Sequence, residues 1–389
     1  MDLAAIQQAL RERHFDAWLF YDHHHRDPIA YKVLGVPESL MVTRRWFYLI
    51  PAEGDPQKIN HRIEAGHLES LPGKRTEYSS WKELFAALEE VLQPYRRIAM
   101  EYSPQNLVPY VGLVDAGTIE LLRSFGKEIV SSGDLVARFE AAWSEDQIQS
   151  HFAARDKVDE ITAAAFQEIG RRVRSGGTHE FEIQQWIMEA FARAGLVTID
   201  PPIVAVNANS GNPHFEPRAD RSTPMREGDW VLLDIWAKLD RPNAVYYDIT
   251  WTGFIGRSPS PKHREIFDIV TRARDIGCEA AKKGVESGRK TAGWEIDQAV
   301  RDFIASKGYG QYFTHRTGHS IGSADVHGNG PNIDNLETKD ERELIPNVAF
   351  SIEPGIYMPE FGVRSEVNVL VRNGSAEVTG RIQKEIVLI

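Results

Sequence analysis

The side chains best suited to chemistry are four acids and one histidine in the C-terminal part of the chain: Asp234, Asp248, His319, Glu353 and Glu366. Each lies in or near the end of a short segment that is typical of a strand. A carboxylate inside an apolar strand is unfavourable unless it is paired, hydrogen-bonded or bound to a metal. Four carboxylates that converge on one sheet need cations between them. The pattern therefore predicts a hydrolytic site that holds two metal ions.

The first two acids lie in the segment WVLLDIWAKLDRPNAVYYDITWTG, which reads as a β-hairpin with its turn near 240–243. Asp248 shares a face with Tyr246 and Thr250 by two-residue alternation. A hairpin of this kind can place Asp234 and Asp248 opposite each other.

The other two acids, Glu353 and Glu366, also interrupt apolar segments that are typical of strands. Glu353 ends the apolar run FSIE at a Pro-Gly turn. Glu366 shares one face of a predicted strand over 363–371 with Arg364 and Asn368. For any single acid, an edge-strand charge or a satisfied salt bridge is an equally good explanation. That explanation is much weaker for four acids and a histidine taken together.

Histidines at three places in the chain are candidates for a role in the site. His319 lies in HRTGHSIGSADVHG, where one imidazole can bind a metal and another, His327, can donate to substrate or to an oxyanion. His214 follows the polar loop 207–213, a setting that suits substrate contact. The run His23-His24-His25 has charged neighbours and is interpreted as a solvated loop rather than a metal site.

The ligand set offers oxygen and nitrogen but no thiolate. Such a set favours Mn²⁺, Co²⁺, Fe²⁺ or Zn²⁺. Two ions that share a water lower its pKa and polarise a scissile carbonyl, and a neighbouring carboxylate can take the proton.

These residues need a scaffold, and the sequence predicts two domains, 1–143 and 144–389. The first alternates predicted strands (17–21, 46–50 and 97–101) with helices, one of them capped by Ser80 and Glu83, and is a small α/β domain. The second begins near Trp143, where Ser144 and Gln147 form another capping box.

The second domain is predicted to be α+β, with helices that flank a mostly antiparallel sheet. One helix runs to about 173, and the next three begin with a cap at Thr178, at Ser260-Pro261 and from Thr291. The predicted strands are 202–206, 230–237, 245–254, 348–353, 363–371 and 384–389.

Composition excludes some classes of function. The net charge of −11 argues against nonspecific binding to nucleic acid or anionic membrane, which needs a basic face. The single cysteine, Cys278, allows no intrachain disulfide. No apolar stretch is long enough for a membrane span, and the N-terminal segment lacks a signal-peptide core, so a cytoplasmic location is expected.

Taken in order, the motifs VAVNANSGNPHF, LLDIWA…YYDITWTG, HRTGHSIG…DVHG, SIEPGIY and GVRSEV resemble those of the pita-bread metallopeptidases, the family of prolidase and aminopeptidase P. The resemblance covers roughly residues 150–389. It implies a pita-bread (creatinase/aminopeptidase) catalytic domain. The N-terminal domain is similar in size and in its general sequence pattern to the smaller creatinase-like domain of these enzymes.

The resemblance also implies roles. Asp234 would bind the first metal ion, and Asp248 and Glu366 would bridge the two ions. His319 and Glu353 would complete the coordination of the second ion. Glu353 would also accept the proton of the bridging water.

Four further residues gain implied roles around that centre. His327 would steady the substrate carbonyl, and His214 would contact substrate near the leaving group. Thr250 and Arg364 would support the bridging carboxylates. The expected metals are two Mn²⁺ ions, with Co²⁺ or Zn²⁺ as alternatives.

The implied activity is hydrolysis of Xaa-Pro bonds, with a Xaa-Pro dipeptidase favoured. The alternatives are an aminopeptidase P that acts on longer peptides and a catalytically silent binding protein of the same fold. A dipeptidase needs a cation for the substrate carboxylate, and the candidates are Arg372, Arg342, Arg364, and Arg44 or Arg45. A homodimer is expected, with no nucleic-acid or membrane partner.

Overall fold

The computed structural model describes residues 1–389, which form two compact units, Met1–Glu140 and Ala141–Ile389. They are called the N-terminal unit and the C-terminal unit below, and each is described by itself. No helix combines the length and the apolar character that crossing a membrane requires.

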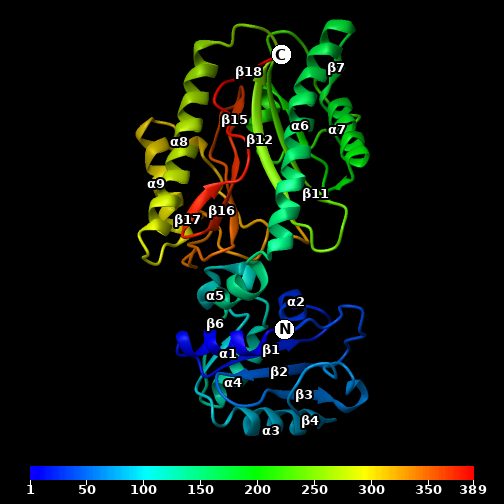
Figure 1. The fold of residues 1–389 in the computed structure, drawn as a ribbon, viewed down its shortest axis with the longest axis vertical. Helices are drawn as coiled ribbons and strands as arrows, with labels where there is room; N and C mark the ends of the chain where they lie inside the picture. The colour runs from blue at the N-terminus through cyan, green and yellow to red at the C-terminus, as the bar shows by residue number, and fades with distance from the viewer. The chain divides into compact units, whose positions relative to one another are not determined.

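The N-terminal unit is built around a six-stranded mixed sheet in the order β4-β3-β2-β1-β5-β6 (Figure 1). Its strands are β1 Ala17–Asp22, β2 Trp46–Pro51, β3 Gln57–His61, β4 Lys74–Tyr78, β5 Arg97–Met100 and β6 Glu128–Ser131. Its α-helices are α1 Leu3–Glu12, α2 Pro28–Leu34, α3 Trp81–Leu92, α4 Ala116–Ser124 and α5 Gly133–Val136.

The sheet of the N-terminal unit is covered on both faces. Trp18 and Phe20 of β1 belong to one apolar cluster with α1 and α2, whereas Leu19 and Tyr21 belong to another with α3 and α4. Every residue of β1 is buried. This explains why the strand reads as a continuous apolar run rather than an alternating one.

In the C-terminal unit, helices lie on two sides of the central strands, with α6 and α7 on one side and α8 and α9 on the other (Figure 1). The helices are α6 Glu145–Ser175, α7 Glu180–Ala194, α8 Pro261–Glu286 and α9 Gly293–Ser306. The strands are β7 Thr178–His179, β8 Leu196–Val197, β9 Ile203–Val206, β10 Pro224–Met225, β11 Trp230–Leu239, β12 Tyr247–Phe254, β13 Ala349–Ile352, β14 Gly355–Tyr357, β15 Gly362–Arg364, β16 Val367–Arg372, β17 Ser375–Val378 and β18 Val387–Leu388.

Two sheets dominate this unit. The larger has the order β18-β12-β11-β8, with β9 also paired to β11, and the smaller has the order β13-β16-β17. The apolar side chains Val231, Leu233 and Ile235 of β11 pack with α6 and α7. Two-residue alternation therefore turns the even-numbered residues of β11 away from those helices.

Several predicted element boundaries are confirmed. Ser80, Ser144 and Ser260 each form a capping box at the start of α3, α6 and α8. The hairpin of β11 and β12 also forms as predicted.

Three predictions were wrong in detail. Thr178 does not cap α7, because Thr178 and His179 form β7 and pair with β10. Helix α9 begins at Gly293 rather than at Thr291. The predicted strand 363–371 is broken at 365–366 into β15 and β16, which belong to different sheets.

Candidate metal centre

The β11–β12 hairpin carries two of the acids on one face. Asp234 lies opposite Thr250, and Asp248 lies opposite Trp236, so the two acids are diagonal neighbours rather than directly opposed as expected. Tyr247 and Ile249 pack with α6 and α7 on the other face. Alternation therefore places Asp234, Asp248 and Thr250 together on the face that those helices do not cover.

His319 lies on a loop next to β13. Gly318 is required there, because a Cβ at this position would lie 1.9 Å from the carbonyl oxygen of Ser351. The backbone N–H of His319 donates to Ser351 Oγ at 2.9 Å, and its Nδ1 lies 3.0 Å from the carbonyl oxygen of Ser320. Since a carbonyl can only accept, Nδ1 carries the proton and Nε2 presents a lone pair.

The last two acids sit where strands end. Glu353 follows β13 directly, and its backbone N–H donates to the carbonyl oxygen of Thr317 at 2.7 Å. Glu366 lies in the break between β15 and β16, and its N–H donates to the carbonyl oxygen of Thr250 at 3.2 Å. The predicted strand is therefore interrupted at a candidate metal ligand.

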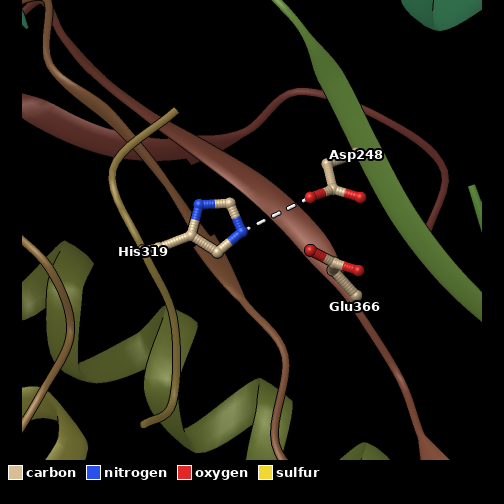
Figure 2. A group of neighbouring side chains, drawn as sticks. All are labelled: Asp248, His319 and Glu366. Atoms are coloured by element: carbon tan, nitrogen blue, oxygen red, sulfur yellow. Dashed lines mark ion pairs between the residues drawn. The ribbon is translucent and has the colours of Figure 1, made fainter. Parts of the chain in front are cut away.

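The structure brings all five predicted ligands together. Ligand atoms of Asp248, His319 and Glu366 lie within 4.8 Å of one another, and Figure 2 shows the three side chains pointing toward a common centre. His319 Nε2 lies 3.4 Å from Asp248 Oδ2 and 3.4 Å from Glu353 Oε1. Asp234 joins through Thr250, whose hydroxyl lies 2.8 Å from Asp234 Oδ1 and 2.9 Å from Glu366 Oε2.

Arg364 is the cation already present in this group. Its Nε donates to Thr250 Oγ1 at 2.8 Å, its Nη2 is ion-paired with Asp234 Oδ2, and its Nε lies 3.9 Å from Glu353 Oε2. Thr250 and Arg364 therefore contact the ligand set as expected. Arg364 pairs with Asp234, however, and not with Asp248, which was expected to be one of the bridging acids.

Burial changes the protonation of the acids. It raises the pKa of Asp248 and of Glu366 far above the usual range, and the charges of neighbouring acids add to this. Burial also raises the pKa of Asp234 to about 7, against the opposing effect of Arg364. For Glu353, burial acts in the same direction, but the charge of Arg364 and the hydrogen bond from the Ser351 hydroxyl favour the carboxylate, and the pKa lies below its usual value.

Two observations show that divalent cations fit these residues. Asp248 Oδ1 and Glu366 Oε1 are buried without a hydrogen-bond partner. His319 presents a lone pair toward carboxylate oxygens, an arrangement that is repulsive unless a cation or a proton lies between them. Burial lowers the pKa of His319, which disfavours that proton. The donor set is the oxygen and nitrogen set that hard to borderline ions accept.

The remaining predicted site residues lie around this group at different distances. The ring of His327 lies 4.2 Å from that of His319, centroid to centroid. His214 is on an exposed loop after the 3₁₀ helix η5 Asn207–Gly211, and no hydrogen bond joins it to the five ligands. The preceding Pro213 carbonyl oxygen lies 3.5 Å from Arg364 Nη1, which connects this loop to the group.

The arginines proposed for a substrate carboxylate are mostly engaged elsewhere. Arg372 is paired with Glu145 at 2.8 Å and contacts none of the five ligands. Arg342 is buried and paired with Asp340 at 2.5 Å. Arg44 and Arg45 belong to the N-terminal unit.

Two positioning residues were missed. Ser351 Oγ accepts from the His319 N–H and lies 2.9 Å from Glu353 Oε1, so it connects two ligands. The side chain of Asn368 exchanges two hydrogen bonds, of 2.9 and 2.7 Å, with the backbone of Asp248. Each lies two residues from a predicted ligand, Glu353 or Glu366, and this spacing was the signal that could have found them.

Comparison with known proteins agrees with this geometry. Residues 155–373, more than half of the chain, match the family model described as metallopeptidase family M24. The chain belongs to this family.

Individual relatives extend the similarity over nearly the whole chain. It is 30% identical over 318 residues to a Xaa-Pro dipeptidase of Pyrococcus horikoshii, covering 80% of this chain and 79% of the relative. It is 27% identical over 380 residues to a putative Xaa-Pro aminopeptidase of Mycoplasma pneumoniae, covering 95% and 94%.

A solved structure shows the same fold. The dipeptidase PepE from Mycobacterium ulcerans superposes with a TM-score of 0.69 at 23% sequence identity, covering 100% of this chain and 96% of that one. The expected fold class is thereby confirmed: a pita-bread catalytic domain that follows a smaller α/β domain. The chain is a hydrolase of the metallopeptidase class.

Proposed function

We propose that this protein is an exopeptidase that uses two divalent metal ions to hydrolyse Xaa-Pro peptide bonds, and that it acts as a Xaa-Pro dipeptidase. The observation that carries the proposal is the convergence of Asp248, Glu353 and Glu366 on the unprotonated nitrogen of His319. Asp234 joins them through Thr250, and two buried oxygens are left without a partner. The names of relatives such as the Pyrococcus horikoshii Xaa-Pro dipeptidase support the choice of substrate.

The proposed ligand roles are supported by how the acids are held. Asp248 and Glu366 each keep one oxygen free of hydrogen bonds and are proposed to bridge the two ions. Asp234, which is paired with Arg364, would complete the coordination of one ion. His319 and Glu353 would complete the coordination of the other. When bound, the ions polarise the scissile carbonyl and make water acidic.

The other residues act on substrate and on the proton. Glu353 holds a low pKa and is proposed to accept the proton of the attacking water. His327, beside His319, would donate to the substrate carbonyl oxygen, and His214 would contact the residue after the scissile bond. Arg372 is occupied by Glu145, so its assignment to the substrate carboxylate rests on the sequence alone.

Mn²⁺ is the proposed metal, with Co²⁺ and Zn²⁺ as alternatives, because all three accept carboxylate and imidazole ligands. We also propose a homodimer with a cytoplasmic location. These proposals are tested by metal analysis of the purified protein, by its mass in solution and by cell fractionation.

A peptide panel tests the activity. Ala-Pro and Met-Pro should be hydrolysed after addition of Mn²⁺, Co²⁺ or Zn²⁺, and Ala-Pro-Ala should be a poor substrate. Comparable kcat/KM values for Ala-Pro-Ala and Ala-Pro would favour the aminopeptidase alternative, which the Mycoplasma pneumoniae relative's name also suggests. Two bound metal ions without hydrolysis of any proline peptide would favour a silent binding protein.

The role of His327 has its own test. His327→Ala should leave the metal content unchanged and lower kcat by about 10²-fold or more, the usual effect of removing one donor to a developing oxyanion. His24→Ala, an exposed histidine in the N-terminal unit, is the matched control and should change neither quantity. Loss of metal from His327→Ala would instead make this residue a ligand.

A further inference from the structure

The N-terminal unit contains a cavity of about 630 Å³, a size that suits a small-molecule ligand. Its lining comes entirely from that unit. Tyr21, Tyr78 and Phe85 contribute aromatic surface, and Trp81 lies on the wall with 60% of its surface exposed. None of the five proposed metal ligands lies on this cavity.

Positive charge gathers on the lining. Three arginines, Arg26, Arg44 and Arg45, face the cavity, and none of their guanidinium groups has a carboxylate partner. The Arg44 guanidinium donates only to the carbonyl and hydroxyl oxygens of Thr43, both at 3.1 Å, whereas the Arg44 backbone N–H donates to Glu64 Oε2 at 3.0 Å. In a chain of net charge −11, three unpaired guanidiniums around one cavity are an unusual concentration of positive charge.

The remaining titratable lining groups leave this excess in place. His23 and His61 add two imidazoles. The one carboxylate on the lining, Asp115, accepts from the backbone N–H and the hydroxyl of Thr118, both at 2.9 Å, as the N-cap of α4. It is therefore committed to its own helix rather than to the arginines.

The loop that carries His23 and Arg26 is built rigidly. The carboxylate of Asp22 accepts from three backbone N–H groups, those of residues 25, 26 and 27, at 2.7–3.1 Å, and from the hydroxyl of Tyr31 at 2.7 Å. These bonds hold His24 and His25 at φ values of 63° and 56°. Strained backbone of this kind persists only where its surroundings fix it, and it is common at ligand clamps.

An aromatic surface completes the cavity. Trp81 meets Phe85 edge-on, with ring centroids 5.4 Å apart and an angle of 74° between the rings. The flexible Lys82 side chain places its Nζ 5.6 Å from the Trp81 ring centroid, and 60% of the Trp81 surface remains exposed. Stacking of a planar ring on such an indole is worth about 1–3 kcal/mol for a nucleic-acid base.

From the unpaired guanidiniums beside this aromatic wall, we propose that the N-terminal unit binds a small organic phosphate with a planar ring, of the nucleoside monophosphate class. Guanidinium groups match the oxygens of a phosphate in pairs. A phosphate dianion also offsets more of the charge of three arginines than a single carboxylate does. The proposal does not rest on the proposed peptidase function, because none of the five proposed metal ligands lines the cavity.

Calorimetric titration of the full-length, metal-free protein tests the proposal, since removing metal ions prevents phosphate from binding at the other site. Adenosine monophosphate should bind with one equivalent, and adenosine at least about tenfold more weakly. Arg26→Gln and Arg44→Gln should each weaken nucleotide binding by about tenfold, because each removes a charge-assisted hydrogen bond at an exposed position. Trp81→Ala should weaken binding of the nucleotide but not of inorganic phosphate.

Arg96→Gln is the matched control, because it removes an exposed arginine of the same unit that is not on the cavity lining. It should leave the affinity unchanged. Equal affinity for adenosine and its monophosphate, no measurable nucleotide binding, or an equal loss in Arg96→Gln and Arg26→Gln would each overturn the proposal. Tighter binding of the aromatic carboxylate indole-3-acetate than of the nucleotide would overturn the assignment to phosphate.

Discussion

Each unit buries a group of acids, and the two groups differ in how their charge is neutralised. In the N-terminal unit, Asp27 and Glu101 are 1% and 0% exposed. Trp18 Nε1 donates to Glu101 Oε1 at 2.8 Å, and Ser132 Oγ lies 3.2 Å from the same oxygen. Burial raises the pKa of both acids, that of Glu101 to about 7. A proton on one of the two removes their repulsion.

The acids of the C-terminal unit are more numerous and have a different neighbour. The free lone pair of His319 points at Asp248 and Glu353, and Glu366 and Asp234 lie beside them, joined through Thr250. One proton can lie between His319 Nε2 and only one of its two acidic neighbours, Asp248 or Glu353, so it leaves the other contact repulsive. Burial of acids alone therefore does not indicate a metal site. An imidazole lone pair directed at them does, because it is an additional ligand.

The largest effect is expected from Glu366→Gln, which should remove metal binding at both positions and lower kcat/KM for Ala-Pro by about 10³-fold or more, since bound ions supply several kcal/mol to such reactions. Metal analysis and peptide hydrolysis measure this. In metal-free protein, the same change should not lower the melting temperature, because the amide needs no proton to be buried. Glu377→Gln, at an exposed position on β17, should behave as the parent.

The acid pair of the N-terminal unit should respond to pH. The pKa of Glu101 is about 7 in the folded state and about 4.5 in the unfolded state. Its contribution to stability is therefore complete below pH ~4.5 and is lost as the pH rises through ~7, a change of roughly 3 kcal/mol. Calorimetric unfolding between pH 5 and pH 8 should show this decline.

Glu101→Gln tests the origin of that decline. The variant should show a flatter dependence of the unfolding temperature on pH than the parent, because its amide does not titrate. If the dependence of the unfolding temperature on pH is unchanged in Glu101→Gln, the pH response belongs to other groups. Neutralisation of the acid pair by a proton would then be contradicted.

A smaller effect is expected from Ser351→Ala, which removes the hydroxyl that joins the His319 backbone to Glu353. Loss of such an outer partner typically lowers metal affinity by 10–100-fold. Titration of metal into the chelator-treated protein measures it. Ser375→Ala, on β17 and hydrogen-bonded to Glu286, is the control and should keep the parent affinity. Equal affinities for parent and Ser351→Ala would show that the loop is held without this hydroxyl.

Much of the scaffold could be predicted because its signals are local. Capping boxes at Ser80 and Ser144 and the Ser260-Pro261 pair marked helix starts, since these signals lie within four residues of one another. Thr178 failed as a cap because a long-range contact prevailed, the pairing of β7 with β10. The break at Glu366 was also missed, since which sheet each half joins depends on partners far away in the chain.

The sequence by itself determined which residues are candidate ligands, because acids in apolar strands and a histidine between glycines stand out against their neighbours. It also determined the face of each hairpin acid, since strand alternation is a local property. Only the tertiary structure decided that Arg364 pairs with Asp234, that Ser351 connects His319 to Glu353, and that three arginines surround a cavity in the N-terminal unit. These contacts join segments whose separation in space is set by packing, and no local pattern records that distance.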